Sequence, residues 1–511
     1  EKDIKMITLI LITTIVIYLI WLWDKQLRKN DFPPGPPRLP VLGSVSSLLE
    51  NRSLPLHVRF YHLVQRYGPI VGINVLGLNI VILGELDIIK EAFKKEELSY
   101  RATNKATLAR SGTTHTLAPA NRGLLSSSSD SWQQHRRFSL KTLRDFGFGK
   151  VGSETIIIEE ATVLLKELSD KHGSSIEINQ NLFSICILNV IWTLIAGTRY
   201  SHSDPELQSL SNSVNRLASV GLGGSPVQAF PNIMRAFPNI TGYNEFISCN
   251  EDVKQFAREQ IRIHKKNLDP ENPCDFIDVY LAQLVDENEN MYTFSEEELV
   301  VVCLDMFVAG IETTTTTLLW AVLLMTKYPH IQEKVHKELR SVLKEDELPT
   351  MAHKTSLPYT EAVMSEIHRF GTIVPNALPH YAEKDTMLGG YRIPRGSFVY
   401  SSIYSVHNNA TYWEDPQNFR PERFLTDEGI YKKHDHLVPF GIGKHICLGE
   451  SLAKMETFIF FTSLMSRMQF SLAEDTPLPS TERQEGVTCG PKPYNVIIHD
   501  RSKVYTTRPE E

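Results

Sequence analysis

The stretch FGIGKHICLG, Phe440–Gly449, decides the fold of this chain. It holds one cysteine, Cys447, in a glycine-rich run, and the next segment, Glu450–Phe460, has a helix-forming composition. A cysteine at a helix N-terminus lies near the positive end of the dipole, which favours its thiolate form. Glycines beside it let backbone N–H groups and a flat ligand approach the sulfur. The pattern predicts a thiolate ligand for a haem iron; the alternative is a buried structural cysteine.

The size and charge of the chain limit its class. Its 511 residues would suggest about three domains, but no break in composition divides the body, so we expect one large domain behind an anchor. Apolar residues make up 42% of the chain, as in globular proteins. The formal net charge of -7 argues against nucleic acid as the main partner, because phosphate binding needs a basic excess.

The six cysteines are widely spread and form no C-x-x-C pair, which leaves zinc and thioredoxin-like sites without support. A disulfide framework would be unusual in so long a chain, so we expect the body to lie in a reducing compartment. The cysteines are Cys186, Cys249, Cys274, Cys303, Cys447 and Cys489.

The N-terminal residues predict a retained membrane anchor over residues 1–30. Met6–Trp23 carries no charge. Its length is just sufficient for a membrane-spanning helix, which needs about 20 apolar residues. It ends in two tryptophans and is followed by Lys25, Arg28 and Lys29, which place the following body in the cytoplasm. A cleaved signal peptide is the alternative, but Trp-Leu-Trp-Asp-Lys offers no small residues for cleavage.

A proline-rich segment follows the anchor. Phe32–Pro37, FPPGPP, is stiff and non-helical because proline fixes φ and lacks an N–H donor. We assign residues 31–40 to a hinge and residues 41–511 to the body. Gly68–Leu83 is rich in β-branched residues and predicts a hairpin, and Tyr391–Tyr400 indicates another strand pair.

Helical periodicity dominates the remainder and predicts a mainly α fold with a small β portion. The apolar, proline-broken segment 221–240 is interpreted as a buried loop. The helices are expected at Asp87–Lys95, Ser131–Arg144, Ser153–His172, Leu182–Ala196, Asn244–Asn267, Asp275–Val285, Ser295–Tyr328, Pro329–Leu343 and Thr360–Phe370.

The longest expected helix contains Ala-Gly-Ile-Glu-Thr at 309–313, and threonines continue to Thr317. Glycine and threonine are weak helix formers, and such a run can open the backbone ladder and bend the helix. An acid beside an alcohol, here Glu312 and Thr313, can order water for the proton delivery that cleavage of dioxygen needs. The alternative is a buried helix in which the threonines only pack.

Two further motifs are weak alone. Trp132 and Arg136 are four residues apart and share a helix face, although a surface amphipathic helix gives the same pattern. Glu366 and Arg369 form an E-x-x-R, which is common in helices as an ion pair. A second arginine, Arg423, occurs downstream in FRPERF.

Taken in order, these motifs resemble the cytochromes P-450 over essentially the whole chain. The stretches FGIGK, CLGESLAKME, RRFSLKTLRDFGFGK and DFIDVYL look like the microsomal family 2, and the haem loop leans towards its fatty-acid-hydroxylating branch. The resemblance implies the cytochrome P-450 fold with an N-terminal transmembrane helix. It also implies that residues 41–511 form a haem-thiolate catalytic domain.

The resemblance assigns haem b (iron protoporphyrin IX) as cofactor and Cys447 as its axial ligand. It assigns Thr313 as the proton-relay hydroxyl and Glu312 as its acid partner. Glu366, Arg369 and Arg423 would form a structural ion network. The implied haem contacts are Arg101, Trp132, Arg136, Ala309, Gly310, His380, Phe440, His445 and Gly449.

Two positions depart from the family pattern. His445 stands where the family usually has arginine, and a neutral imidazole cannot replace a guanidinium fork at a haem propionate. Ala102 follows Arg101 where a proline is usual. The candidate substrate-pocket residues, for which core packing is the alternative, are Phe307, Val308, Ala309, Ile373, Val374, Thr488 and Cys489.

The activity implied is a haem-thiolate monooxygenase acting on an apolar fatty acid, steroid or xenobiotic. The chain has no G-x-G-x-x-G dinucleotide signature, so electrons would come from NADPH through NADPH–cytochrome P-450 reductase, with cytochrome b5 as a further candidate partner. The reductase would dock on basic residues: Arg136, Arg137, Lys432, Lys433 and Lys444.

The implied location is the endoplasmic reticulum membrane, with a single pass and a cytoplasmic catalytic domain. By the same resemblance, segment 221–240 dips into the membrane lipid and flanks the substrate entrance. The alternative functions are a reductase-independent peroxide isomerase and a non-catalytic haem or lipid carrier. An isomerase of this kind tends to lack the acid–alcohol pair that Glu312 and Thr313 form here.

Overall fold

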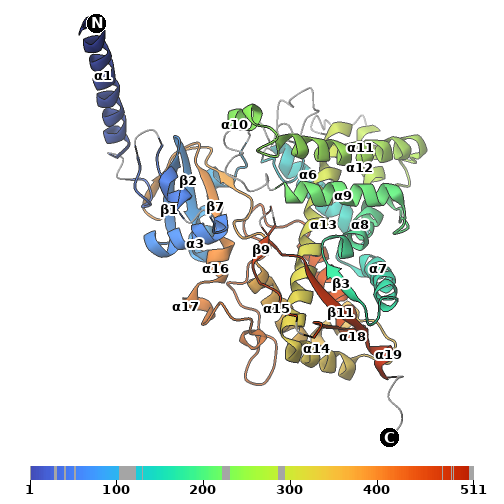
Figure 1. Ribbon diagram of the computed structural model, residues 1–511. Helices are drawn as coiled ribbons and strands as arrows, with labels where there is room; N and C mark the ends of the chain where they lie inside the picture. The colour runs from blue at the N-terminus through green and yellow to red at the C-terminus, as the bar shows by residue number, and fades with distance from the viewer. Residues whose placement is uncertain are drawn as a thin grey trace. The chain divides into compact units, whose positions relative to one another are not determined.

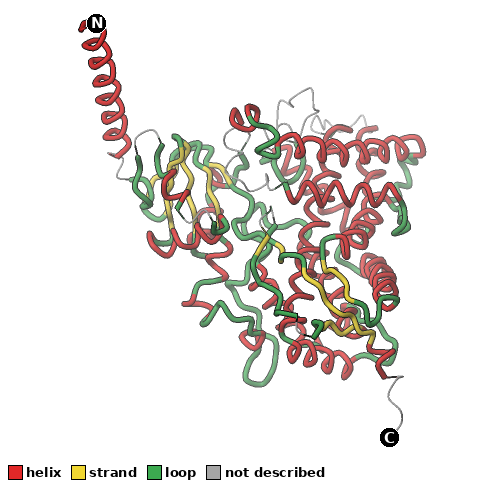
Figure 2. The backbone as a smooth tube through the Cα atoms, viewed as in Figure 1, coloured by secondary structure: helices red, strands yellow, loops and turns green. Residues whose placement is uncertain are grey.

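The computed structural model describes residues 2–27, 31–39, 42–50, 53–102, 122–128, 130–220, 231–285, 294–474, 476–484, 486 and 488–505. Helices predominate and strands form small sheets, which confirms the expected class (Figures 1 and 2).

The α-helices are α1 (Lys2–Leu27), α2 (Val45–Leu49), α3 (Leu56–Tyr67), α4 (Leu86–Lys94), α6 (Asp130–Asp145), α7 (Val151–Ser169), α8 (Asn181–Ala196), α9 (Pro205–Ser219), α10 (Pro231–Ala236), α11 (Tyr243–Asn267), α12 (Phe276–Val285), α13 (Glu296–Lys327), α14 (Pro329–Val342), α15 (Pro358–Gly371), α16 (Ile403–His407), α17 (Ala410–Trp413), α18 (Glu450–Arg467) and α19 (Arg501–Tyr505). Short 3-10 helices are η1 (Glu96–Leu98), η3 (Met351–Ser356) and η4 (Pro421–Phe424). The strands are β1 (Ile70–Val75), β2 (Leu78–Leu83), β3 (Ser175–Ile178), β4 (His380–Tyr381), β5 (Thr386–Leu388), β6 (Tyr391–Ile393), β7 (Phe398–Ser401), β8 (Met468–Ser471), β9 (Arg483–Gln484), β10 (Gly490–Pro491) and β11 (Tyr494–Asp500).

The chain forms two compact units from interleaved segments. The sheet unit comprises residues 1–102, 375–409 and 441–446, and the helix unit comprises residues 103–374, 410–440 and 447–511. The division into anchor, hinge and catalytic domain stays a prediction, because these units follow other boundaries.

The sheet unit is built on the order β1-β2-β7-β4. The expected hairpin is present: β1 and β2 are antiparallel, with Ile70 opposite Leu83. Strand β7 is parallel to β2 and antiparallel to β4. The expectation that Tyr391–Tyr400 forms one strand pair is wrong, because β6 pairs with β5. Gly389 and Gly390 both have positive φ, so they join β5 to β6 by a two-residue turn that favours this pairing.

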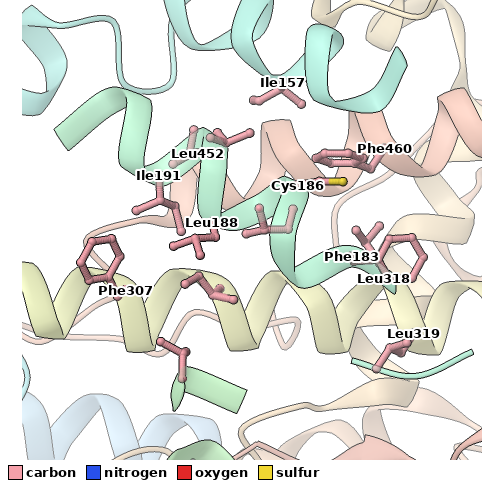
Figure 3. Packing of buried hydrophobic residues seen from close by; sticks show 14 of the residues in the cluster. Ile157, Phe183, Cys186, Leu188, Ile191, Phe307, Leu318, Leu319, Leu452 and Phe460 are labelled. Atoms are coloured by element: carbon pink, nitrogen blue, oxygen red, sulfur yellow. The ribbon is translucent and has the colours of Figure 1, made fainter. Parts of the chain in front are cut away.

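The helix unit is organised around α13, which packs against α8, α9, α11 and α18 (Figure 1). Its core contains fully buried side chains from several helices. Figure 3 shows Phe307 of α13 facing Ile191 of α8, with Leu452 of α18 nearby. Each such side chain contributes about 1.5–3 kcal/mol on burial. The helices expected in this unit are present, and the residues at which they begin and end differ slightly from those predicted.

Two helices of more than ten residues, α3 and α9, lie outside the expected set. The start of α9 carries a recognisable signal. Asp204 caps it by accepting hydrogen bonds from the backbone N–H groups of Glu206 and Leu207, and Pro205 occupies the first turn. The sequence Asp-Pro-Glu thus marks the start of this helix, and its apolar residues Leu207, Leu210, Val214 and Leu217 recur at helical spacing, a second signal.

Helix α1 has the length and composition of a membrane span. Asp3–Trp21 has a mean hydropathy of 2.3, and none of it is buried in the protein. Helix α13 is also long and apolar, but 72% of its most apolar window is buried, so it is a core helix. The side chains of Lys25, Arg28 and Lys29 and residues 221–230 lie outside the described residues.

Glu366 and Arg369 of α15 form a fully buried ion pair. Arg369 donates from Nε and Nη2 to the two Glu366 oxygens, each at 2.7 Å, and Arg423 Nε approaches Oε1 at 3.2 Å. Arg369 also donates to Pro416 O at 2.9 Å. The three charged residues therefore join α15 to η4 and the segment before it.

Arg369→Ala should destabilise the fold strongly, because it removes the bidentate partner and leaves Glu366 buried with one arginine. We expect a loss of about 3–5 kcal/mol in the free energy of unfolding, measured by denaturant titration. The chain holds a matched control: Glu259-x-x-Arg262 on α11 has the same spacing but is exposed, and Arg262→Ala should leave the unfolding midpoint unchanged. Equal effects of the two substitutions would contradict this account.

Candidate active site

Cys447 lies in a tight turn just before α18. Its backbone N–H donates to Phe440 O at 3.0 Å, and Gly441 and Gly443 both have positive φ, which other residues rarely adopt. Cys447 is exposed, whereas Cys186, Cys249, Cys303 and Cys489 are buried. Cys447 thus differs in exposure from these four cysteines, and its role as a ligand stays a prediction.

The groups around the Cys447 sulfur shift the pKa of its thiol in opposite directions. Burial among neighbouring protein atoms raises the pKa of the thiol, the Gly449 N–H lowers it, Glu450 raises it, and Arg136 lowers it. The net shift is upward, so the expected stabilisation of the thiolate by the start of α18 does not prevail in the protein alone. A metal ion that binds a thiol displaces its proton outright, and the Gly449 N–H and Arg136 would then stabilise the anionic sulfur.

Trp132 and Arg136 lie together on α6, as their spacing predicts. The Arg136 guanidinium carbon is 5.7 Å from the Trp132 ring centroid. Burial lowers the pKa of Arg136, and Cys447 raises it. The indole N–H of buried Trp132 donates to Leu124 O at 3.0 Å. The donor assigned to a haem propionate by resemblance is thus used by the backbone here, and a propionate would have to replace that bond.

Phe440, at the other end of the cysteine turn, is partly buried. Its ring lies 5.7 Å from the partly buried His368 ring and 5.3 Å from Lys454 Nζ. Burial, followed by the charge of Lys454, lowers the pKa of His368 to about 4. The turn is therefore fixed between α15 and α18 by a neutral imidazole and an aromatic contact.

Three candidate propionate contacts come together within the sheet unit. Arg101 Nη1 donates to Leu378 O at 2.5 Å and to Pro379 O at 3.1 Å. The His380 ring is 5.5 Å from that of His445, and its Nδ1 is 3.1 Å from Leu98 O. Burial lowers the pKa of His380 well below its ordinary value, with Arg101 and His445 acting in the same direction. His380 is therefore neutral at physiological pH.

The middle of helix α13 is buried apart from a few positions. Met306, Ala309, Gly310 and Thr313 are partly exposed at helical spacings of three and four, and Val308 is partly exposed beside them. The Thr313 hydroxyl donates to Ala309 O at 2.6 Å. A helix with small residues and a hydroxyl on its accessible face is suited to the close approach of a flat ligand, as the resemblance implies for Ala309 and Gly310.

Glu312 does not contact Thr313. It is 6% exposed, and its Oε1 accepts hydrogen bonds from Thr488 and, at 3.5 Å, from Thr316. Adjacent helix residues point in different directions, which explains the separation. Burial raises the pKa of Glu312 to about 7, although both hydroxyls lower it. A direct acid–alcohol contact is thus absent from the described contacts of this pair.

Several candidate pocket residues converge beside α13. The Cys489 N–H donates to Ile373 O at 2.7 Å, and Cys489 O accepts from the Trp320 indole at 2.9 Å. Val308, Ile373 and Val374 are partly buried, whereas Thr488 and Cys489 are buried. Phe307 is fully buried, with its ring centroid 5.2 Å from that of Trp192, so the structure places it in the core.

Other buried acids of the helix unit were not among the sequence candidates. Asp305 Oδ2 accepts from the N–H groups of Leu124 and Leu125 at 2.5 and 2.8 Å, and Glu298 accepts from Gly123 N at 2.7 Å. The signal was available, because Asp305 is a single acid within the apolar run VVVCLDMFVAG.

Glu456 of α18 is a second overlooked acid. It is 1% exposed, its Oε2 accepts from the Thr314 hydroxyl at 3.0 Å, and its Oε1 has no hydrogen-bond partner among the described residues. Burial raises its pKa to about 8. A lone acid in the apolar part of CLGESLAKMETFIFF is again the sequence signal.

The donor set fits a haem group held through sulfur. Cys447 offers an exposed sulfur with a backbone N–H and Arg136 acting on it. In the helix unit, α13 separately presents Ala309 and Thr313 partly exposed, whereas a Cβ on Gly310 would overlap Ile191 of α8. A thiolate and small accessible side chains are what such a cofactor requires.

Comparisons with known proteins give the class of protein to which this fold and thiol site belong. The family model for Cytochrome P450 matches residues 33–498. The chain is 32% identical to Cytochrome P450 2U1 of Homo sapiens over 96% of this chain and 93% of that protein. It is 33% identical to Farnesoate epoxidase of Bombyx mori (96% and 99%) and 35% to Cytochrome P450 2B19 of Mus musculus (96% and 99%).

The chain therefore belongs to the cytochrome P450 family and is a monooxygenase. Its relatives include microsomal family 2 members, as the sequence details indicate. Membership implies haem iron as cofactor.

The raised pKa of Glu456 gives a pH-dependent test. The folded protein retains a proton up to about pH 8 that the unfolded chain releases near the ordinary value of 4.5. Stability from the neutral carboxyl is complete below pH 4.5 and is lost as pH rises through 8. Glu456→Gln is neutral throughout, so its stability relative to the original protein should rise between pH 5 and 8, by at most about 1.4 kcal/mol per pH unit.

Denaturant unfolding at several pH values measures this difference. Glu450→Gln is the matched control, since Glu450 lies on the same helix but is partly exposed and paired with Lys454 at 2.6 Å. A difference between Glu456→Gln and the original protein that stays constant over this pH range would show that Glu456 is ionised in the fold.

Proposed function

We propose that this protein is a membrane-anchored haem-thiolate monooxygenase that inserts one atom of dioxygen into an apolar small molecule with electrons from NADPH. The observation that carries the proposal is the exposed Cys447 sulfur, with its Gly449 and Arg136 partners, in a chain of this family. When bound, the haem supplies dioxygen activation, and a thiolate ligand favours O–O cleavage. The protein's own residues must hold the cofactor, manage the protons and bind the substrate.

Cys447 would be the axial ligand, and Arg136, Trp132, Phe440 and Gly449 would hold the cofactor. The contacts from Arg101, His380 and His445 stay predictions of the resemblance. Charge favours Arg101 among these three as a propionate contact, since its guanidinium is always charged. Neutral His380 could offer only a hydrogen bond.

Thr313 and Glu312 would manage the protons that oxygen cleavage consumes. Thr313 lies on the accessible stripe of α13, and its hydroxyl hydrogen bonds Ala309 O. Glu312 has a pKa raised to about 7, which matches a group that must both hold and release a proton at neutral pH. Because the two side chains do not touch, the proposal requires water between them.

The substrate would be apolar, because the candidate pocket residues Val308, Ile373 and Val374 are apolar and partly buried. One relative is named for the epoxidation of farnesoate, which is an apolar chain with a carboxylate. This supports a fatty acid, isoprenoid, steroid or xenobiotic as the substrate class. Electrons would come from NADPH through NADPH–cytochrome P-450 reductase, with cytochrome b5 as a further donor.

The protein would be held in the endoplasmic reticulum membrane by a single pass of α1, with a cytoplasmic body. Exposure supports a second lipid contact. Ile233, Phe237 and Ile240 at and after α10 are 41%, 55% and 85% exposed, which is unusual for large apolar side chains in one short segment.

Sulfur ligation has a direct spectroscopic test. The reduced, carbon monoxide-treated protein should show the red-shifted Soret band of anionic sulfur ligation, and Cys447→Ser should lose it because the thiolate is gone. Cys274→Ser is the matched control, since Cys274 is the other exposed cysteine among those that the structure describes. Retention of the band in Cys447→Ser would refute the assignment of the ligand.

The need for NADPH distinguishes the proposed monooxygenase from the alternative, a peroxide isomerase. The proposed monooxygenase should consume NADPH with reductase to form product, whereas an isomerase would act on an organic hydroperoxide alone. A spin-shift screen with fatty acids, steroids and drug-like amines would first identify a ligand. Product formation from hydroperoxide without any NADPH-dependent oxidation would favour the isomerase.

Membrane attachment should have two parts. Deletion of residues 1–30 should lower binding to phospholipid vesicles without abolishing it, because the exposed apolar side chains after α10 remain. Adding Phe237→Ser and Ile240→Ser to the deletion should remove most of the residual binding in a flotation assay. Val151→Ser, at a 76% exposed apolar residue elsewhere, is the control for general surface polarity. Equal loss with Val151→Ser would argue against a localised contact.

A further inference from the structure

Glu312 belongs to a chain of buried neutral hydrogen bonds that spans three parts of the helix unit. The Gln180 amide, immediately before α8, donates to Thr316 Oγ1 at 3.2 Å. Thr316 donates to Glu312 Oε1 at 3.5 Å, and Thr488, between β9 and β10, donates to the same oxygen. Glu312, Thr316 and Thr488 are all at least nine-tenths buried.

The donor directions in this chain follow from chemistry. In the structure, Thr316 Oγ1 accepts from the Gln180 amide nitrogen and donates its own hydrogen to Glu312 Oε1. With Thr488 also donating there, Oε1 receives two hydroxyl hydrogens. A protonated carboxyl carries its hydrogen on one oxygen only, and an oxygen that accepts two hydrogen bonds is the unprotonated one.

We propose that Thr488 is a positioning residue for Glu312: with Thr316 it fixes Oε1 as the acceptor oxygen, so that the exchangeable proton is carried on Oε2 and is delivered from there. The use of this proton in oxygen cleavage rests on the proposed monooxygenase function, whereas the arrangement of the carboxyl does not.

The position of Thr488 connects proton supply to the candidate substrate pocket. Its neighbour Cys489 is tied on both sides, by its N–H to Ile373 O and by its carbonyl to Trp320. A Cβ on Gly490 would lie 3.6 Å from Thr316 Cγ2, so the start of β10 packs directly on α13. Residues 488 and 489 are candidates for substrate contact, and Thr488 is also the residue that orients the acid.

A role limited to packing or substrate contact predicts something different. If Thr488 only lined the pocket, its loss would change substrate affinity and leave the fate of the protons alone. If it only packed, threonine and valine would be equivalent, because their shapes match. The hydroxyl matters only if Glu312 needs it, which makes Thr488→Val and Thr488→Ser a discriminating pair.

The first test is infrared spectroscopy of the ferric holoenzyme at about pH 6, below the pKa of about 7 given by the surroundings of Glu312. The band of the protonated carboxyl is identified by its loss in Glu312→Gln. Thr488→Val should shift this band to higher frequency, because the C=O group accepts one hydrogen bond fewer. Thr488→Ser should restore it. A band unmoved in Thr488→Val overturns the proposal.

The second test measures the partition between oxygenated product and released hydrogen peroxide with NADPH and reductase. Thr488→Val should lower the product-to-peroxide ratio about fivefold, the change that corresponds to one hydrogen bond of about 1 kcal/mol. The substrate concentration for half-maximal rate should change less. A change confined to substrate affinity overturns the proposal and supports a lining role.

Two further variants keep the result decisive. Thr316→Val removes the other donor to the same oxygen and should act in the same direction, so it replaces Thr488→Val if that variant fails to fold. Thr326→Val is the matched control, a buried threonine of α13 whose hydroxyl bonds Val322 O within its own helix, and it should change neither readout. If the original protein shows the infrared band but no NADPH-dependent oxidation, the proposed function fails while the positioning of Glu312 stands.

Discussion

The requirement that a buried carboxyl group must find hydrogen-bond donors shapes the region around α13. Removal of a carboxylate from water costs several kcal/mol unless donors replace the lost hydration. Helix α13 contributes three such acids, and two segments remote from it in sequence supply donors to them. Glu298 and Asp305 take backbone N–H groups of residues 123–125, and Glu312 takes the hydroxyl of Thr488. Loops remote in sequence are thereby held on one helix.

The same constraint prepares these acids for chemistry. Burial raises the pKa of Glu298 and of Glu312 to about 7, and neutral donors bring it down only in part. An acid balanced in this way is a suitable proton donor at physiological pH. The hydroxyl on the accessible stripe of α13 belongs to Thr313, the residue that follows Glu312. The helix thus keeps its acid inside the protein and its alcohol at the accessible surface.

The sequence predicted the class of fold and the identity of the thiol site, because both depend on patterns local to the chain. Cys447 is recognisable from its glycines and the helix that follows, and α13 from its length and its Ala-Gly-x-Glu-Thr centre. The partners of Glu312 could not be predicted in this way. Thr488 is 176 residues from Glu312, and nothing in GVTCGPKP indicates which buried acid its hydroxyl meets. The same holds for Trp132, whose indole N–H is satisfied by a nearby carbonyl of Leu124.

The predicted pairing of β6 was also wrong, for a physical reason. Strand-forming residues were recognised, but the partner of a strand is chosen by turn geometry and by the neighbouring sheet edge. A Gly-Gly turn closed β6 onto β5, while β7 found β2 across more than 300 residues of chain.

Glu366 and Glu312 show how partner chemistry separates structural from functional acids of equal burial. Glu366 meets two guanidinium groups, Arg369 at 2.7 Å and Arg423 at 3.2 Å. Charge-assisted bonds of this kind are short and hold the carboxylate in one geometry. Glu312 meets two hydroxyls, which lower its pKa but do not outweigh the burial that raises it to about 7. Replacing hydroxyls by arginines at Glu312 would therefore stabilise the anion and remove the reason to place an acid there, whereas hydroxyls let the group gain and lose its proton without losing its place.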